Sequence, residues 1–268
     1  MSDQAFVEPP IIDTHAHIFV RGLPLAENAW TRPQYDYSAE NYVDDLDAHG
    51  ISFGVIAAAS LFDDYNDYTL KALRKYARLR ATVRLDPDVD PYTLARLAGE
   101  GVVGVRLQWK RGAEPDLRTY RYRRFLMRLA DLGLHVELNA SGPRLADLLP
   151  AIEDAGARTV IDHFGLLRAQ DGLEGEGFAA LARAVERGST WVKLSASFRI
   201  DAERIQPYAE AILRIAGPDR VFWGSDAPFV GHEGELTYGD TVAAFRAMVP
   251  DAATRRAISD SALRFYFF

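Results

Sequence analysis

Residues 134–164 read LHVELNASGPRLADLLPAIEDAGARTVIDHF, and this stretch contains one complete strand–helix–strand unit. The short runs LHVELNA (134–140) and RTVIDHF (158–164) are mainly apolar and contain β-branched side chains, which is typical of buried strands. Between them, GPRLADLLPAIEDAG has helical spacing and ends at glycine, a residue that often terminates a helix. This order predicts a parallel sheet in which a helix connects one strand to the next.

The same unit recurs along the whole chain. Six further strands are expected at residues 11–17, 51–59, 79–85, 102–109, 190–196 and 220–225. The helical patterns between strands, such as SAENYVDDLDAHG (38–50), again end at glycine or proline. Eight strands that alternate with helices over about 250 residues match a (β/α)8 barrel better than a doubly wound sheet. We therefore predict an α/β fold with one TIM-type barrel over residues 1–268, in which residues 1–10 form an N-terminal extension.

The composition is that of a globular protein, with 48% hydrophobic and 26% charged residues and a formal net charge of −7. Neither a disordered chain nor a broad nucleic-acid-binding surface fits this balance. The sequence has no cysteine, which excludes disulfides and thiolate metal sites. No apolar run approaches the ~18 residues of a membrane span, and the N-terminus lacks a signal-peptide pattern. We expect a cytoplasmic protein that binds neither nucleic acid nor membranes, and the sequence leaves its oligomeric state open.

Four ionisable side chains stand at the ends of expected strands. His15 and His17 end the first strand, and residues two apart on a strand point to the same side, so both imidazoles are expected inside the barrel. His163 closes the sixth strand and Asp226 follows the eighth. The carboxyl ends of barrel strands carry the active site. Because a carboxylate and three imidazoles can activate water and polarise a carbonyl, we predict that these four residues are catalytic.

These motifs resemble those of the amidohydrolase superfamily, in the branch that includes 2-pyrone-4,6-dicarboxylate lactonase and sugar lactonases. The HxH of IIDTHAH, the VIDHFG and the WGSDAP occur in the family's order, and VVGVRLQWKR, LHVEL and VKLSASFR also fall in the expected order. The resemblance covers residues 11–265. It implies the barrel fold and the hydrolysis of esters, lactones or amides, usually at a metal centre, while some branches decarboxylate or isomerise.

The resemblance also bears on metal binding. Metal-dependent members typically add a lysine, glutamate or histidine from the fourth or fifth strand, where this chain has Gln108 and Asn139. Asparagine is a poor zinc ligand. The match to the metal-independent lactonase branch therefore predicts no metal and no other cofactor. The alternative is a catalytic zinc held by His15, His17 and Asp226, because three protein ligands and a water describe many zinc sites.

A small anionic, carboxylated substrate is predicted because several cations should ring the mouth of a barrel that is acidic overall. Arg106 lies in the apolar run VGVRL, where an unpaired charge would be expensive. Guanidinium groups bind carboxylates in a bidentate manner, and the resemblance carries substrate binding over to Arg106, Tyr35 and Arg199. We therefore assign substrate binding to Arg106, Lys110, Arg111, Arg199, Tyr35 and Asn139.

The predicted function is hydrolysis of a carboxylated lactone, such as 2-pyrone-4,6-dicarboxylate or a sugar-acid lactone. Asp226 would deprotonate the attacking water, while His15, His17 and His163 stabilise the oxyanion. Phe229 stands where the pyrone-dicarboxylate enzymes have histidine, so a substrate with a single carboxylate is an equal expectation. Two alternatives stay open: a lactone isomerase, and a zinc-dependent decarboxylase or amidohydrolase.

Overall fold

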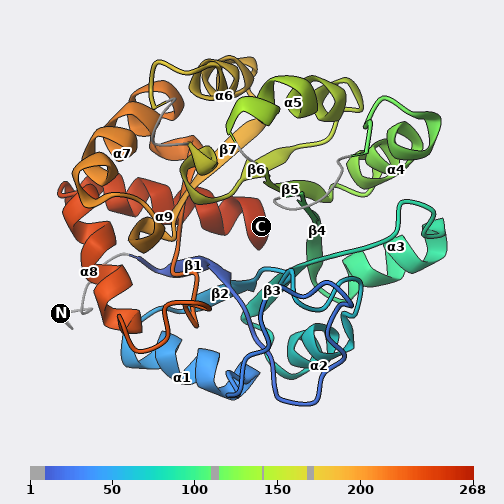
Figure 1. Ribbon diagram of the computed structural model, residues 1–268, viewed down its shortest axis with the longest axis horizontal. Coiled ribbons are helices and arrows are strands. Elements are labelled where there is room, and N and C mark those ends of the chain that lie inside the picture. The colour runs from blue at the N-terminus through green and yellow to red at the C-terminus, as the bar shows by residue number, and fades with distance from the viewer. Residues whose placement is uncertain (1–9, 110–114, 141, 168–171) are drawn as a thin grey trace, which may run out of the picture.

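The computed structural model describes residues 10–109, 115–140, 142–167 and 172–268, and it confirms the predicted (β/α)8 barrel (Figure 1). The strands are β1 (Ile12–Ala16), β2 (Phe53–Ile56), β3 (Leu79–Val83), β4 (Val102–Gln108), β5 (His135–Asn139), β6 (Thr159–Ile161), β7 (Thr190–Ser195) and β8 (Val221–Gly224). The helices are α1 (Ala39–Ala48), α2 (Asp67–Lys75), α3 (Pro91–Gly99), α4 (Tyr120–Asp131), α5 (Leu145–Asp154), α6 (Glu176–Arg187), α7 (Ala202–Ala216), α8 (Tyr238–Met248) and α9 (Ala252–Tyr266). None of the described helices is long and apolar enough to cross a membrane.

The strands follow one another around the barrel in chain order, and each pairs in parallel with the next. The ring closes between β1 and the residues that follow β8. The His17 N–H donates to the Ala227 carbonyl at 2.7 Å, and the Asp226 N–H donates to the His15 carbonyl at 2.8 Å. This closing seam places the histidines of the first strand beside the aspartate that follows the last one.

An irregularity in β1 decides which of its side chains enter the barrel. Between Asp13 and Ala16, β1 advances three residues while β2 advances two. Such a β-bulge re-aims the side chains that follow it. The Asp13 carboxylate, before the bulge, points outward and accepts a 2.9 Å hydrogen bond from the Tyr238 hydroxyl of α8. His15, two residues further along, instead enters the barrel interior, where it meets side chains of β4, β5 and β7.

The final helix closes the amino-terminal end of the barrel. Tyr266 of α9 is buried in a cluster with Ile12, Val160 and Phe222, which come from β1, β6 and β8. In Figure 1, α9 runs towards the middle of the ring of strands, and the C-terminus lies there. Apolar packing therefore fills this end of the barrel, while the polar groups gather near the opposite, carboxyl-terminal end.

Gly224, the last residue of β8, has no room for a side chain. A Cβ atom at this position would lie 2.4 Å from the Cβ of His15. We expect Gly224→Ala to lower the free energy of unfolding by about 1–3 kcal/mol, the usual range for overpacking, and to displace His15. Gly99→Ala is the matched control, because Gly99 ends α3 and, apart from its chain neighbours and the backbone of its own helix, no atom would lie within 4 Å of its Cβ. Urea unfolding of both variants measures the effect, and equal stability of the two would contradict this expectation.

Candidate active site

Asp226, directly after β8, is the centre of a polar cluster at the carboxyl-terminal mouth of the barrel. Its Oδ1 lies 3.3 Å from His17 Nε2, 3.5 Å from His15 Nε2 and 3.9 Å from His163 Nε2. Asp226 is 3% exposed, and its φ of 63° lies in the left-handed region, which non-glycine residues rarely adopt except where a site demands it. The structure thus brings together the four residues that were predicted to be catalytic.

The second oxygen of the same carboxylate faces a cation at the rim. Arg199 Nε donates to Asp226 Oδ2 at 3.1 Å, and Arg199 Nη2 donates to the Val230 carbonyl at 3.0 Å. The arginine side chain keeps 30% of its surface exposed, so it reaches the site from solvent. Lys110 and Arg111, the other two cations predicted near the mouth, lie outside the described residues.

The site environment favours an ionised carboxylate beside neutral imidazoles. Burial alone would raise the pKa of Asp226, but the neighbouring imidazoles of His163 and His17 hold it well below its usual range. Burial lowers the pKa of His163 to about 4 and lowers that of His15 well below 6.5. At neutral pH, Asp226 is therefore ionised, while His15 and His163 are uncharged.

A layer of buried charges lies directly beneath this cluster. Lys193 of β7 donates to Glu137 Oε2 at 2.6 Å and lies 3.5 Å from Asp162 Oδ1. Arg106 of β4 places Nε 2.9 Å from Glu137 Oε1 and Nη2 2.9 Å from Asp162 Oδ2. The Lys193 ammonium also lies 3.1 Å from His15 Nδ1. Two cations and two carboxylates thus compensate one another, and the network touches the active site through His15.

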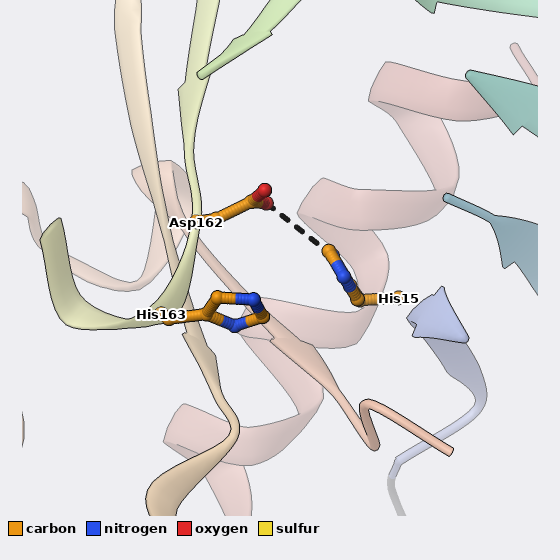
Figure 2. A group of neighbouring side chains, drawn as sticks. All are labelled: His15, Asp162 and His163. Atoms are coloured by element: carbon orange, nitrogen blue, oxygen red, sulfur yellow. Dashed lines mark ion pairs between the residues drawn. The ribbon is translucent and has the colours of Figure 1, made fainter. Parts of the chain in front are cut away.

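Asp162 and His163 are consecutive residues, yet both face His15 (Figure 2). Asp162 Oδ1 lies 3.3 Å from His15 Nδ1, and the rings of His163 and His15 have centroids 4.7 Å apart. Neighbouring side chains on a regular strand would point to opposite sides. Positive φ values at His163 (49°) and Phe164 (57°) bend the chain just after β6, and this bend lets both polar side chains face the interior.

The structure places Arg106 deeper than the sequence analysis expected. The residue is 2% exposed, and its Nη1 donates to the Ala58 carbonyl at 2.7 Å, while its other donors face Asp162 and Glu137. A guanidinium with its donors engaged in this way supports the site from below rather than clamping a substrate at the rim. The expectation that its charge needs partners is met, but the partners are carboxylates of the protein itself.

The remaining predicted substrate-binding residues occupy different parts of the mouth. The Tyr35 hydroxyl donates to Glu233 Oε1 at 3.2 Å, so Tyr35 lies at the rim beside the segment that follows β8. Asn139 ends β5, is 6% exposed, and its Oδ1 has no hydrogen-bond partner among the described residues. Its register partner on β4, Gln108, has a buried Oε1 that also lacks a described partner. Buried polar atoms are normally satisfied, so these two side-chain oxygens are exceptions within the described part of the chain.

Sequence reasoning missed four buried polar residues: Glu137, Asp162, Lys193 and Ser195. Glu137 and Lys193 each carry a charge inside an apolar strand, which is the signal that singled out Arg106. Applied to LHVEL and VKLS, the same signal would have found both of them. The sequence could not predict which of these charges pair, because the partners come from strands that are remote in the sequence.

Two sets of side chains bring possible metal ligands together. His15, His17 and Asp226 offer donor atoms within 4.8 Å of one another, and so do His15, Asp162 and His163. Cations of the protein already lie against these donors, however, because Arg106 Nη2 is 3.4 Å from His15 Nε2 and Arg199 Nε is 3.1 Å from Asp226 Oδ2. A divalent ion would sit beside these fixed positive charges.

Comparison with known proteins gives consistent similarities. The family model for amidohydrolases matches residues 12–268. A 4-sulfomuconolactone hydrolase from Hydrogenophaga intermedia is 30% identical over 85% of this chain and 78% of its own length. A structure from Pseudomonas putida, provisionally named a 2-pyrone-4,6-dicarboxylic acid hydrolase, is 38% identical with a TM-score of 0.88, over 95% of this chain and 96% of that chain. A similarly named protein from Acinetobacter baumannii with citric acid bound is 29% identical with a TM-score of 0.92, over 96% of this chain and 99% of that chain. The resemblance seen in the sequence motifs is thereby confirmed.

The buried charge layer predicts a specific stability response. Lys193→Met would leave the carboxylates of Glu137 and Asp162 with one cation fewer, and breaking a buried ion pair from one side costs roughly 3–5 kcal/mol. Lys193→Met combined with Glu137→Gln removes one charge of each sign, so the double variant should be more stable than the single one. Urea unfolding of the two variants tests this coupling. A single variant as stable as wild type, or a double variant that loses the sum of both effects, would contradict it.

Proposed function

The chain belongs to the amidohydrolase family, and we propose that this member hydrolyses a lactone that carries a carboxylate or a similar acidic group. The observation that carries this proposal is the setting of Asp226, whose Oδ1 faces three imidazoles while its Oδ2 is held by Arg199. A buried, ionised carboxylate beside neutral imidazoles combines a base for water with donors for a carbonyl oxygen. The similar hydrolases are named for acidic lactones, which supports the same substrate class here.

In the proposed reaction, Asp226 takes a proton from a water molecule as the water oxygen bonds to the lactone carbonyl carbon. The carbonyl oxygen becomes an oxyanion, and imidazole N–H groups stabilise its charge in a site sheltered from solvent. The ring C–O bond then breaks. Asp226 returns its proton to the departing oxygen, so that the product is a hydroxy acid, or an enol acid where the lactone is a pyrone, and the enzyme regains its starting state.

We propose that the substrate's acidic group binds at the rim formed by β4, β5 and the segment after β7. Arg199 supports this, because its guanidinium is partly exposed and lies against Asp226. The side-chain oxygens of Asn139 and Gln108, which have no partner among the described residues, support a polar contact on the opposite strands. Lys110 and Arg111 add positive charge in the sequence next to β4. We assign Tyr35 to the outer rim, where the Tyr35–Glu233 pair would limit the size of the substrate.

We further propose that the protein works in the cytoplasm on this small anionic substrate and does not bind nucleic acid. The absence of cysteine from the sequence and the formal net charge of −7 support both points.

Asp226→Asn tests the proposed base. The amide cannot take a proton from water, and general-base catalysis is worth roughly 10²–10⁴-fold, so kcat should fall by at least about 10²-fold while the substrate still binds. Asp154→Asn, at the exposed end of α5, is the control and should keep the wild-type rate. Steady-state kinetics and calorimetric titration with a slowly turned-over lactone separate the two effects. If the Asp226 variant turned over substrate near the wild-type rate, the proposed role of Asp226 as the base would be wrong.

Metal-independent turnover is the companion proposal, and the cations placed against both donor sets support it. We expect a panel of carboxylated and sulfonated lactones to be hydrolysed at an undiminished rate after dialysis against a strong chelator. Loss of activity that zinc restores would overturn this proposal and would assign His15, His17 and Asp226 as ligands. NMR of the products distinguishes ring opening from isomerisation between two lactones, the alternative suggested by the 24% identical D-galactarolactone isomerase.

A further inference from the structure

A neutral imidazole carries its proton on one of its two ring nitrogens, and only that nitrogen can donate a hydrogen bond. We propose that Ser195 is a positioning residue that holds His163 in the tautomer with its proton on Nε2, the nitrogen that faces the reaction centre. The catalytic consequence rests on the proposed function, whereas the tautomer itself does not.

The hydroxyl of Ser195 contacts a ring nitrogen of His163. Ser195 ends β7 and is 2% exposed, and its Oγ lies 2.9 Å from His163 Nδ1. Within the described part of the chain, the Ser195 hydroxyl has no other hydrogen-bond partner. If Nδ1 carried the proton and donated it, the buried hydroxyl hydrogen would have no acceptor, at a cost of about 1–3 kcal/mol. Nδ1 therefore accepts, and the proton of a neutral His163 lies on Nε2.

This tautomer points a donor into the site. His163 Nε2 lies 3.9 Å from Asp226 Oδ1, a separation longer than a direct hydrogen bond. The Nε2–H of His163 can therefore donate to a substrate carbonyl oxygen that lies between His163 and Asp226. Burial lowers the pKa of His163 to about 4, so the ring donates as a neutral imidazole at physiological pH.

His17 differs from His163 in the ring nitrogen that carries the proton. Its Nδ1 lies 2.8 Å from the Ala57 carbonyl, which can only accept, so this nitrogen must carry a proton. A neutral His17 therefore has no proton on Nε2, and it can donate from there only as an imidazolium. His163 has the opposite arrangement. Of these two rings, His163 is the one built to polarise a substrate carbonyl while it remains uncharged.

The surroundings of His163 hold its ring in this orientation. The residue is 8% exposed, its ring packs edge-on against His15 with centroids 4.7 Å apart, and its backbone φ of 49° belongs to the bend after β6. The hydrogen bond from Ser195 makes the two ring nitrogens different, because it engages Nδ1 alone. Removing it leaves Nδ1 without this donor and should let the Nδ1–H form appear without displacing the ring.

The tautomer can be measured directly. Two-bond ¹H–¹⁵N spectra of protein labelled on histidine distinguish a protonated ring nitrogen from an unprotonated one, and the signals of His163 are those that vanish in His163→Gln. In wild-type protein at pH 7, we expect a protonated Nε2 and an unprotonated Nδ1. In Ser195→Ala, a mixture of tautomers or the Nδ1–H form should appear. A wild-type His163 protonated on Nδ1, or an unchanged spectrum in Ser195→Ala, would overturn the proposal.

Kinetics test the consequence for catalysis. Ser195→Ala should lower kcat by about 10- to 100-fold, the usual effect of removing a group that orients a catalytic side chain, with KM little changed. Ser195→Thr keeps the hydroxyl and should restore both kcat and the wild-type spectrum. Ser52→Ala, at an exposed position before β2, is the control for serine removal. If no lactone is turned over but the spectra behave as expected, the proposed function fails and the tautomer assignment stands. Unchanged kcat in an active Ser195→Ala enzyme would refute the positioning role.

Discussion

Four buried charges inside the closed barrel compensate one another, and their pairing ties neighbouring strands together. Arg106 and Lys193 lie within ion-pair distance of both Glu137 and Asp162, and all four residues are at most 2% exposed. Each isolated ion would cost several kcal/mol in such a place, so the four strands that carry them must keep their register for the charges to stay paired. These paired charges hold His15 in place, because His15 contacts both Lys193 and Asp162.

Backbone irregularities then turn a regular barrel into a site. Asp13, before the bulge in β1, points outward and His15 points inward, and the absence of a side chain at Gly224 leaves space for His15 against β8. Positive φ values at His163 and Asp226 aim both side chains over the mouth. Such conformations are costly in isolation, and they persist because the packed strands beneath them determine the path of the chain.

The layer of buried ion pairs and the Asp226–histidine cluster above it have different roles. Charges in the lower layer hold the imidazole of His15, while the upper layer holds an ionised Asp226 among imidazoles whose buried members are neutral. Arg199 alone, among the described members of these two layers, combines a contact to Asp226 with substantial exposure. This arrangement suits a family whose similar members are named for the hydrolysis of acidic lactones, with base and donors buried and the positive charge for orientation at the rim.

The fold could be predicted from the sequence, because eight apolar runs separated by helical patterns have few solutions other than a barrel. The convergence of His15, His17, His163 and Asp226 could be predicted as well, because strand ends in a barrel share one mouth. The folded structure was needed to see that Arg106 pairs with Glu137 and Asp162 below the site, that Lys193 completes this layer, and that Ser195 bonds to His163. The physical reason is that alternation along a strand reveals which side chains turn inward, whereas partners across a barrel depend on register, bulges and bends that local patterns do not encode.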